Sequence, residues 1–183
     1  VIEHRIQTEK GVDVKSSPPI VVYRETITKA CPGEAEGKSP NKHNKLYFTV
    51  EPLTPEMTEA IKNKEIPEGR VKKKDDKLTE ALEKYGMDNK EARKVKDVFE
   101  GNLFVDGTRG IVHIGEIIEL VLDMFEDVMK KGPIAKEPCI NVKVTMTDCK
   151  LHEDAIHRGP AQIYPAVRDG IREAMRASNP LLF

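Results

Sequence analysis

The chain has 183 residues, of which 33% are charged and 38% hydrophobic, with 30 Lys and Arg against 31 Asp and Glu. This length is enough for one domain with a hydrophobic core, and the formal net charge of -1 excludes a global attraction to nucleic acid or anionic membranes. No run approaches the roughly 20 apolar residues that span a bilayer, so we expect a cytoplasmic protein without a membrane partner. Cys31, Cys139 and Cys149 include no CxxC pair, which indicates free thiols.

The first residues are predicted to end another structural unit. Residues 1–10 suit the last turns of a helix that Gly11 can cap, residues 12–15 form a short strand, and a Ser-Ser-Pro-Pro break follows. The chain starts without Met and ends on Leu-Leu-Phe, so we expect a segment of a longer protein. We predict the tail of a preceding domain and a linker over 1–16, and the main domain over 17–183.

The next region is predicted to contain two antiparallel strands and a charged insert. Residues 20–28 are rich in β-branched side chains, and apolar residues alternate with polar ones over 46–51, so a long loop over 31–45 joins two strands. Residues 54–100 carry three apolar patterns at helical spacing, at 57–61, 78–82 and 92–99, which predicts short, mostly surface helices. Their Lys72-Lys73-Lys74 run is either a phosphate patch or, as we favour because Asp75-Asp76 follows, a solvated face.

The last part of the chain alternates strands and helices. A third strand is predicted at 103–105, a long amphipathic helix over 114–129 that Gly132-Pro133 ends, and a half-buried strand over 140–146. A loop over 148–159 then leads into a helix with Pro160 in its first turn. This order predicts an α+β fold in which two helices cover one face of a sheet.

Two apparent motifs fail on spacing. Residues 33–39, Gly-Glu-Ala-Glu-Gly-Lys-Ser, imitate a phosphate-binding P-loop, but only three residues separate the glycines and Pro40 prevents a helix, so we expect a flexible hairpin loop. His152 and His157 imitate a helical HExxH zinc site, but they are five residues apart and leave a shared helix face. Asp148 and Cys149 nearby leave a metal-dependent hydrolase open as an alternative, although we predict neither a metal site nor a catalytic residue.

The loops over 31–45 and 148–159 meet at one end of the sheet if the strands before them run in the same direction. Together they offer a cluster of hydrogen-bond donors and cations of the kind that contacts RNA phosphates and sugars. Its members are Lys38, Asn41, Lys42, His43, Asn44, Lys45, His152, His157, Arg158 and Gln162. The alternative is that both are simply solvated loops.

Three stretches carry a family resemblance. SPPIVVYRET (17–26), SPNKHNKLY (39–47) and LHEDAIHRGPAQI (151–163) resemble the archaeal and eukaryotic translation elongation factor 2 family of translocation GTPases. Gly159-Pro160-Ala161 resembles the archaeal form. The resemblance implies that residues 1–16 end the factor's third domain, and that residues 17–183 are its fourth domain, with a fold like the second domain of ribosomal protein S5.

The resemblance also implies a function. The fourth domain of this family enters the decoding site of the small ribosomal subunit while tRNA and mRNA move by one codon. On the matching motif, His157 is the residue that diphthamide-synthesis enzymes modify and that diphtheria toxin-type ADP-ribosyltransferases attack. GTP and Mg are bound by the first domain of the family, so we expect no cofactor and no enzymatic activity in this monomeric segment. A general RNA-binding domain with an S5-like fold is a further alternative.

Overall fold

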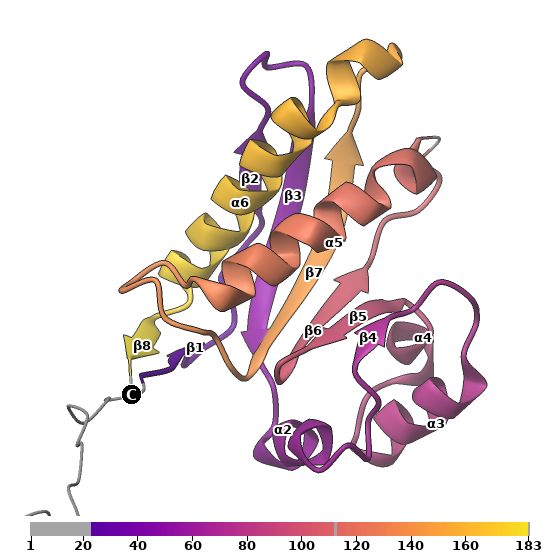
Figure 1. The fold of residues 1–183 in the computed structure, drawn as a ribbon, viewed down its shortest axis with the longest axis vertical. Coiled ribbons are helices and arrows are strands. Elements are labelled where there is room, and N and C mark those ends of the chain that lie inside the picture. Colours follow the sequence, from indigo (N-terminus) through magenta and orange to yellow (C-terminus); the bar gives the residue numbers. More distant parts are fainter. Residues whose placement is uncertain (1–22, 112, 183) are drawn as a thin grey trace, which may run out of the picture.

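A six-stranded sheet with the strand order β2-β3-β7-β6-β5-β4 forms the centre of the molecule (Figure 1). The structure is a computed structural model and describes residues 23–111 and 113–182. The strands are β2 (Ala35–Lys38), β3 (Lys45–Pro52), β4 (Gly69–Arg70), β5 (Val95–Phe99), β6 (Asn102–Asp106) and β7 (Val142–Lys150). Neighbouring strands are antiparallel except β6 and β7, which are parallel. The predicted helix over 1–10 and strand over 12–15 lie outside the described residues.

Two long helices, α5 (Ile114–Lys130) and α6 (Pro160–Ala177), lie over the same face of this sheet (Figure 1). Helix α5 connects the parallel strands β6 and β7, as such a crossover requires. Its apolar stripe and that of α6 pack on Phe48, Phe104 and Val144 to form the main core. After α6 the chain forms β8 (Pro180–Leu182), which pairs antiparallel with β1 (Glu25–Ile27).

The insert covers the opposite face of the sheet at its β4-β5-β6 edge. It contains α2 (Pro55–Lys62), α3 (Asp76–Lys84) and α4 (Asn89–Ala92), which begin at the capping side chains of Thr54, Asp75 and Asp88. Their apolar residues pack on these strands as a second core. The buried members of that core are Met57, Ala60, Ile61, Ile66, Leu78, Leu82, Met87, Ala92, Val95, Val98, Leu103 and Val105.

Glycines bring β2 into close contact with α6. A Cβ on Gly37 would lie 1.9 Å from the carbonyl oxygen of Ala166, and a Cβ on Gly170 would lie 2.6 Å from the Phe48 ring. No larger side chain fits these positions without moving the backbone or the ring. Strand β2 is therefore fixed against the middle of α6, and this brings the loop that follows β2 close to the loop that precedes α6.

The predicted sheet with two helices on one face is confirmed, as are the strand at 103–105, the helix over 114–129 and the helix that begins at Pro160. The likeness to ribosomal protein S5 stays a prediction. The strand predicted over 140–146 begins at Val142 and runs on to Lys150, so the loop predicted from Asp148 begins later.

The helical prediction for residues 92–99 is wrong, because Val95–Phe99 is strand β5. A β-bulge between Val95 and Asp97 shifts the alternation of the strand. Val95 and Val98 therefore share a face at a spacing of three residues, which imitates a helix. The insert helices lie at the surface as predicted, and one face of each is buried in the second core.

The flexible loop predicted over 31–45 is also wrong, because it contains β2, and the hairpin is formed by β2 and β3. The described part of the strand predicted at 20–28 is β1, which pairs with β8 instead of β3. The imitation of a P-loop is thus mostly a strand whose Gly37 faces α6. Within the part of the chain that the structure describes, no helix is long and apolar enough to cross a membrane.

Candidate functional site

Two loops form the tip at one end of the sheet, residues 39–44 between β2 and β3 and residues 151–159 between β7 and α6 (Figure 1). Strands β2 and β7 are both antiparallel to β3, so they run in the same direction and both deliver their loops to this end. The sequence predicted that the two loops meet if the strands before them run in the same direction. They do, although the strand before the first loop is β2 and not the strand predicted at 20–28. We call these two loops the tip.

The first loop is a tight turn that is closed by its own polar side chains. The Ser39 hydroxyl donates to Asn41 Oδ1 (2.5 Å) and accepts from the backbone N–H of Asn44 (3.1 Å). Asn41 Oδ1 also accepts from the backbone N–H of His43 (3.0 Å). Lys42 has a positive φ of 62° at the turn. These bonds leave the side chains of Lys42 and His43 exposed at the end of the loop.

Asn44 joins the two loops. Its side chain is fully buried, and its amide donates to the carbonyl oxygen of His157 (2.6 Å) while its Oδ1 accepts from the backbone N–H of His152 (2.9 Å). A second connection runs from the backbone N–H of Asn41 to Gln162 Oε1 at 3.0 Å. Because a buried amide pairs with both loops, the position of one loop fixes the position of the other.

The second loop ends in a short 3-10 helix, Ala155–Arg158, directly before α6. Asp154 caps it by accepting from the backbone N–H of Ile156 at 3.1 Å. The backbone N–H of Asp154 donates to His152 Nδ1 (3.0 Å), which leaves the ring proton on Nε2 when the imidazole is neutral. Ile156 itself is 78% exposed, so it adds an apolar side chain to the surface of the tip.

Three imidazole rings meet at the tip. The ring centroids of His43 and His152 are 4.9 Å apart, those of His43 and His157 are 4.9 Å apart, and those of His152 and His157 are 4.4 Å apart. The rings come from both loops, so the cluster exists only when the loops are joined. The exposed His43 ring and the half-exposed rings of His152 and His157 offer hydrogen-bond donors, acceptors and stacking faces to a partner.

Arg158 differs from the other predicted tip residues, because its side chain is buried. Its guanidinium donates to the carbonyl oxygens of His152 (2.5 Å) and Glu153 (2.8 Å) and to Glu116 Oε2 (2.5 Å) on α5. Those bonds hold the pKa of the Glu116 carboxyl below its usual range. The side chain thus braces the second loop from inside, where it has little surface for a partner.

Lys38 and Lys45 lie below the tip, on the strands. In the register of the sheet Lys38 is opposite Lys45, and Lys45 is opposite Lys150 on β7. Like charges directly opposite one another weaken strand pairing, and the exposed Glu36, 3.3 Å from Lys38, offsets little of that repulsion. Lys150 was not predictable from the alternation of β7, because the register shifts opposite Tyr47 and Phe48 and puts Cys149, instead of residue 150, on the core face.

The proposed metal ligands do not gather. Cys149 is buried in the main core, and burial raises the pKa of its thiol to about 12, whereas His152 and His157 stand at the tip. Across residues 23–111 and 113–182, no group of three His, Cys, Asp or Glu side chains is placed to hold a metal ion. The hydrolase alternative therefore has no geometric support in the described residues.

Comparison with known proteins identifies the family to which the chain belongs. The chain belongs to the translation factor family described as "Elongation factor G, domain IV", whose model matches residues 62–179. It is 51% identical over 183 residues to Elongation factor 2 of Methanococcoides methylutens, 50% identical over 181 residues to that of Thermococcus kodakarensis, and 51% identical over 179 residues to that of Methanocaldococcus jannaschii. These alignments cover 100%, 98% and 97% of this chain and 24% of each relative, so the chain spans about a quarter of the length of the curated relatives it matches.

Proposed function

We propose that this chain is the ribosome-entering domain of an archaeal elongation factor 2. In the full-length factor it promotes GTP-dependent translocation of tRNA and mRNA by occupying the decoding site of the small subunit. The observation that carries the proposal is the tip, in which buried Asn44 joins two loops into one projecting end. Membership of the elongation factor G domain IV family and similarity to archaeal Elongation factor 2 support it.

The tip is suited to contacts with RNA. Lys42 and His43 are exposed on the first loop, and His152 and His157 are half-exposed on the second. A cation pairs with backbone phosphates, and imidazoles donate to phosphate and 2′-hydroxyl groups or stack on unpaired bases. Arg158, Asn41, Asn44 and Gln162 position these side chains from below. Lys38 and Lys45, together with Lys150, would meet phosphates that lie beside the tip.

The mechanism is steric and electrostatic. The tip occupies the space that the moving tRNA leaves, and its donors and cations hold the RNA that lines that space. In this mechanism the residues of the tip break no bond. GTP and Mg are bound by another domain of the full-length factor. The factor acts as a monomer in the cytoplasm. Residues 1–16 of this chain belong to the third domain of the factor.

His157 is the proposed site of diphthamide. Its half-exposed ring in the 3-10 helix is accessible to a modifying enzyme, whereas its carbonyl oxygen is tied to Asn44. The added arm ends in a fixed quaternary cation and extends the reach of the tip toward the codon and anticodon. Diphthamide-synthesis enzymes and diphtheria toxin-type ADP-ribosyltransferases are therefore proposed partners.

The proposed function is tested by His157→Ala in the full-length factor. We expect slower or less accurate single-round translocation with an unchanged melting temperature, because the ring is not part of either core. Lys131→Gln, an exposed change far from the tip, is the control and should leave translocation unchanged. Normal translocation by His157→Ala would contradict a role of His157 in translocation. Unfolding of the variant would show that the His157 ring stabilises the fold instead.

Mass spectrometry of the peptide 147–168 from the native host tests the modification. A diphthamide-sized increment at His157 is expected. An unmodified His157 in native material would contradict the assignment while leaving the rest of the proposed function in place.

A further inference from the structure

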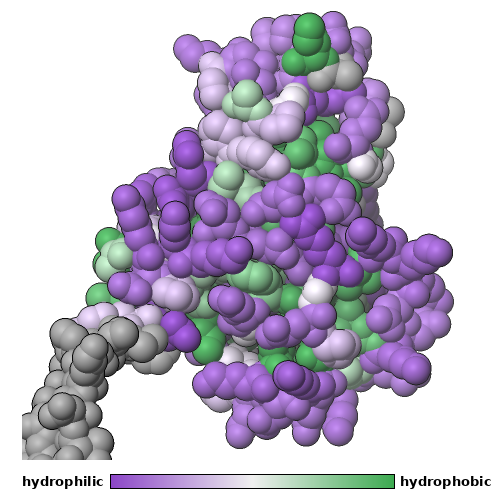
Figure 2. Space-filling model, viewed as in Figure 1, coloured by the Kyte–Doolittle hydropathy of each residue, from purple (hydrophilic) through white to green (hydrophobic). Residues whose placement is uncertain are grey.

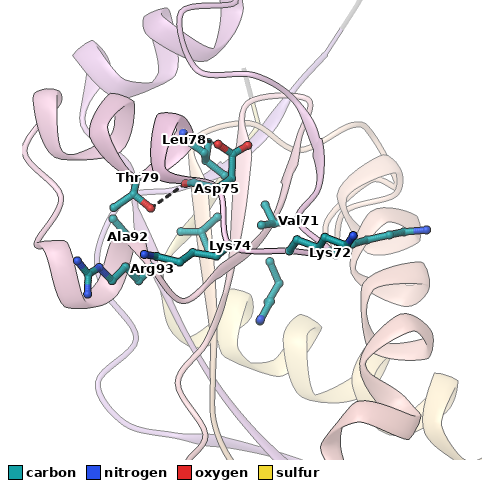
Figure 3. A pocket seen from close by; sticks show the side chains of 11 residues that line it. Val71, Lys72, Lys74, Asp75, Leu78, Thr79, Ala92 and Arg93 are labelled. Atoms are coloured by element: carbon teal, nitrogen blue, oxygen red, sulfur yellow. Dashed lines mark hydrogen bonds between the residues drawn. The ribbon is translucent and has the colours of Figure 1, made fainter.

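A basic hollow lies on the insert, on the surface between the segment 71–75, α3 and β5 (Figure 3). Its volume is about 190 Å³, and its apolar floor includes Val71, Leu78 and Val95. Five cations surround this floor: Lys72, Lys73, Lys74, Arg93 and Lys96. Figure 3 shows Lys74 and Arg93 extending toward one side of the hollow and Lys72 toward the other. The residues of the basic hollow are in neither loop of the tip.

These cations are largely uncompensated. One carboxylate lines the hollow, that of Asp75, and it is engaged as the cap of α3 by accepting from the backbone N–H of Leu78 at 3.1 Å. Lys74 pairs with the exposed Asp76 at 3.2 Å. The other four cations have no acidic group within 4 Å among the described residues. The neighbouring Arg70, by contrast, has such partners in Glu119 and Glu126, each at 2.7 Å.

The charge of the basic hollow is therefore a local feature of a chain whose net charge is -1. Keeping four unpaired cations around one concave surface is unfavourable in the free protein, and an anion relieves the repulsion. A second hollow adjoins the first and shares Lys72, Lys73 and Lys74. The three lysines of the segment 71–75 thus line both hollows, and a basic surface longer than one hollow suits anions that repeat along a backbone better than a single small anion.

We propose that the basic hollow binds the phosphate backbone of double-helical RNA. None of the described residues that line either hollow is aromatic, so neither offers the stacking platform that single-stranded RNA requires. Contacts to phosphates alone are typical of recognition of an RNA duplex by shape and charge. The choice of RNA as the polyanion rests on the proposed function. The tip then sets the position of the domain on the RNA, and the basic hollow adds a second point of attachment.

The test is fluorescence anisotropy of a labelled RNA duplex titrated with the 183-residue chain at several salt concentrations. The variant Lys72→Gln/Lys73→Gln/Arg93→Gln removes three cations of the basic hollow and leaves the Lys74–Asp76 pair intact. The matched control, Lys29→Gln/Lys62→Gln/Lys131→Gln, removes three exposed cations elsewhere. We expect the hollow variant to reduce the slope of log K against log salt by about 2 to 3, equally for duplexes of different sequence. The control should retain the slope of the wild type.

Three results would overturn the proposal. Binding by the hollow variant that equals the wild type means that the cations do not contact RNA. An equal loss in the control means that only net charge matters. Competition by phosphatidylserine vesicles that is as strong as that of the duplex, and equally dependent on the hollow, makes a membrane surface the occupant.

The experiment separates this inference from the proposed function. The hollow variant should keep the footprint of the tip on decoding-site RNA, because the tip loops are untouched. A Lys42→Gln/His43→Ala variant should lose that footprint and keep duplex binding. Loss of duplex binding in the tip variant alone would place the duplex at the tip and overturn the second site.

Discussion

In the tip, two loops are joined by hydrogen bonds from polar side chains, whereas the insert is joined to the sheet by buried apolar side chains. Asn44, Gln162 and Arg158 carry the connections of the tip. Ten buried hydrophobic residues of the insert and two of β6 form its connection to the sheet, and the surface over the insert is mostly hydrophilic (Figure 2). The shape of the tip thus depends on a few polar groups, whereas the stability of the domain depends on its two cores. Substitutions in the tip should therefore affect function, and substitutions in the cores should affect folding.

The largest expected effect is in the insert. Leu82→Ala removes a fully buried side chain of the second core and should lower the free energy of unfolding by about 2–5 kcal/mol. Glu80→Ala, an exposed position of the same helix, should stay within about 0.5 kcal/mol of the wild type. Urea denaturation measures both. A loss below 1 kcal/mol for Leu82→Ala would contradict the role of the apolar core in holding the insert.

A smaller effect is expected in the tip. Asn44→Ala leaves the carbonyl oxygen of His157 and the backbone N–H of His152 without their partner and should cost about 1–3 kcal/mol. Hydrogen exchange should accelerate at His152 while the amides of β7 and α5 stay protected. Asn63→Ala, at an exposed helix end, is the control. Unchanged exchange at His152 would mean that Asn44 does not join the loops.

The contact between the insert and α5 should depend on pH. Asp97 on β5 is fully buried, its carboxyl oxygens lack hydrogen-bond partners among the described residues, and burial and the charge of Glu126 raise its pKa to about 7. The opposing influence of the Arg70 guanidinium is smaller. Because the folded state holds the proton more tightly than the unfolded state, this stabilisation is complete below the unfolded pKa of 3.8 and is lost as pH rises through 7.

Asp97→Asn should therefore remove part of the fall in melting temperature between pH 4 and 7. A shift of the pKa from 3.8 to about 7 corresponds to about 4 kcal/mol, so we expect a difference of up to about 4 kcal/mol across this range, at about 2–4 °C per kcal/mol for a domain of this size. Asp127→Asn, exposed on α5, should keep the pH profile of the wild type. Parallel profiles for Asp97→Asn and the wild type would show that Asp97 is ionised in the folded state throughout.

The smallest expected effect on stability is at the end of the tip. Ile156→Ser replaces an apolar side chain that is 78% exposed, so the free energy of unfolding should change by less than about 0.5 kcal/mol. Ile163→Ser, two turns away and fully buried, should lower it by several kcal/mol. Thermal unfolding of the pair checks this contrast. A strongly destabilised Ile156→Ser variant would contradict the view that the tip is held by polar bonds.

The elements with a regular apolar period were predictable from the sequence. The stripe of α5 and the alternation of β7 correctly identified the helix and strand that form the main core. Strand β5 was not predictable, because its bulge gives Val95 and Val98 a helical spacing. Strand β2 was hidden by Gly37, a residue with low strand propensity that is needed for the approach of α6.

The site was predictable in composition and less so in geometry. The sequence placed His43, His152 and His157 in two loops that can meet, but the contact of their rings depends on the fold. It did not reveal that Arg158 points inward, because the pairing with Glu116 joins residues 42 positions apart. It favoured a solvated face for Lys72-Lys73-Lys74, since Arg93 and Lys96 join that run only in the folded insert.

The most direct test of the central claim is directed cleavage of ribosomal RNA from the tip. A Lys42→Cys variant of the full-length factor, with the half-exposed Cys31 replaced by Ser and other accessible cysteines removed, carries an iron-EDTA probe while Cys139 and Cys149 stay buried. A Lys131→Cys probe on the body of the domain is the control. We expect cuts from Lys42→Cys that are confined to decoding-site RNA of the small subunit and are absent from the control. Cuts elsewhere, or the same cuts from both probes, would contradict the central claim.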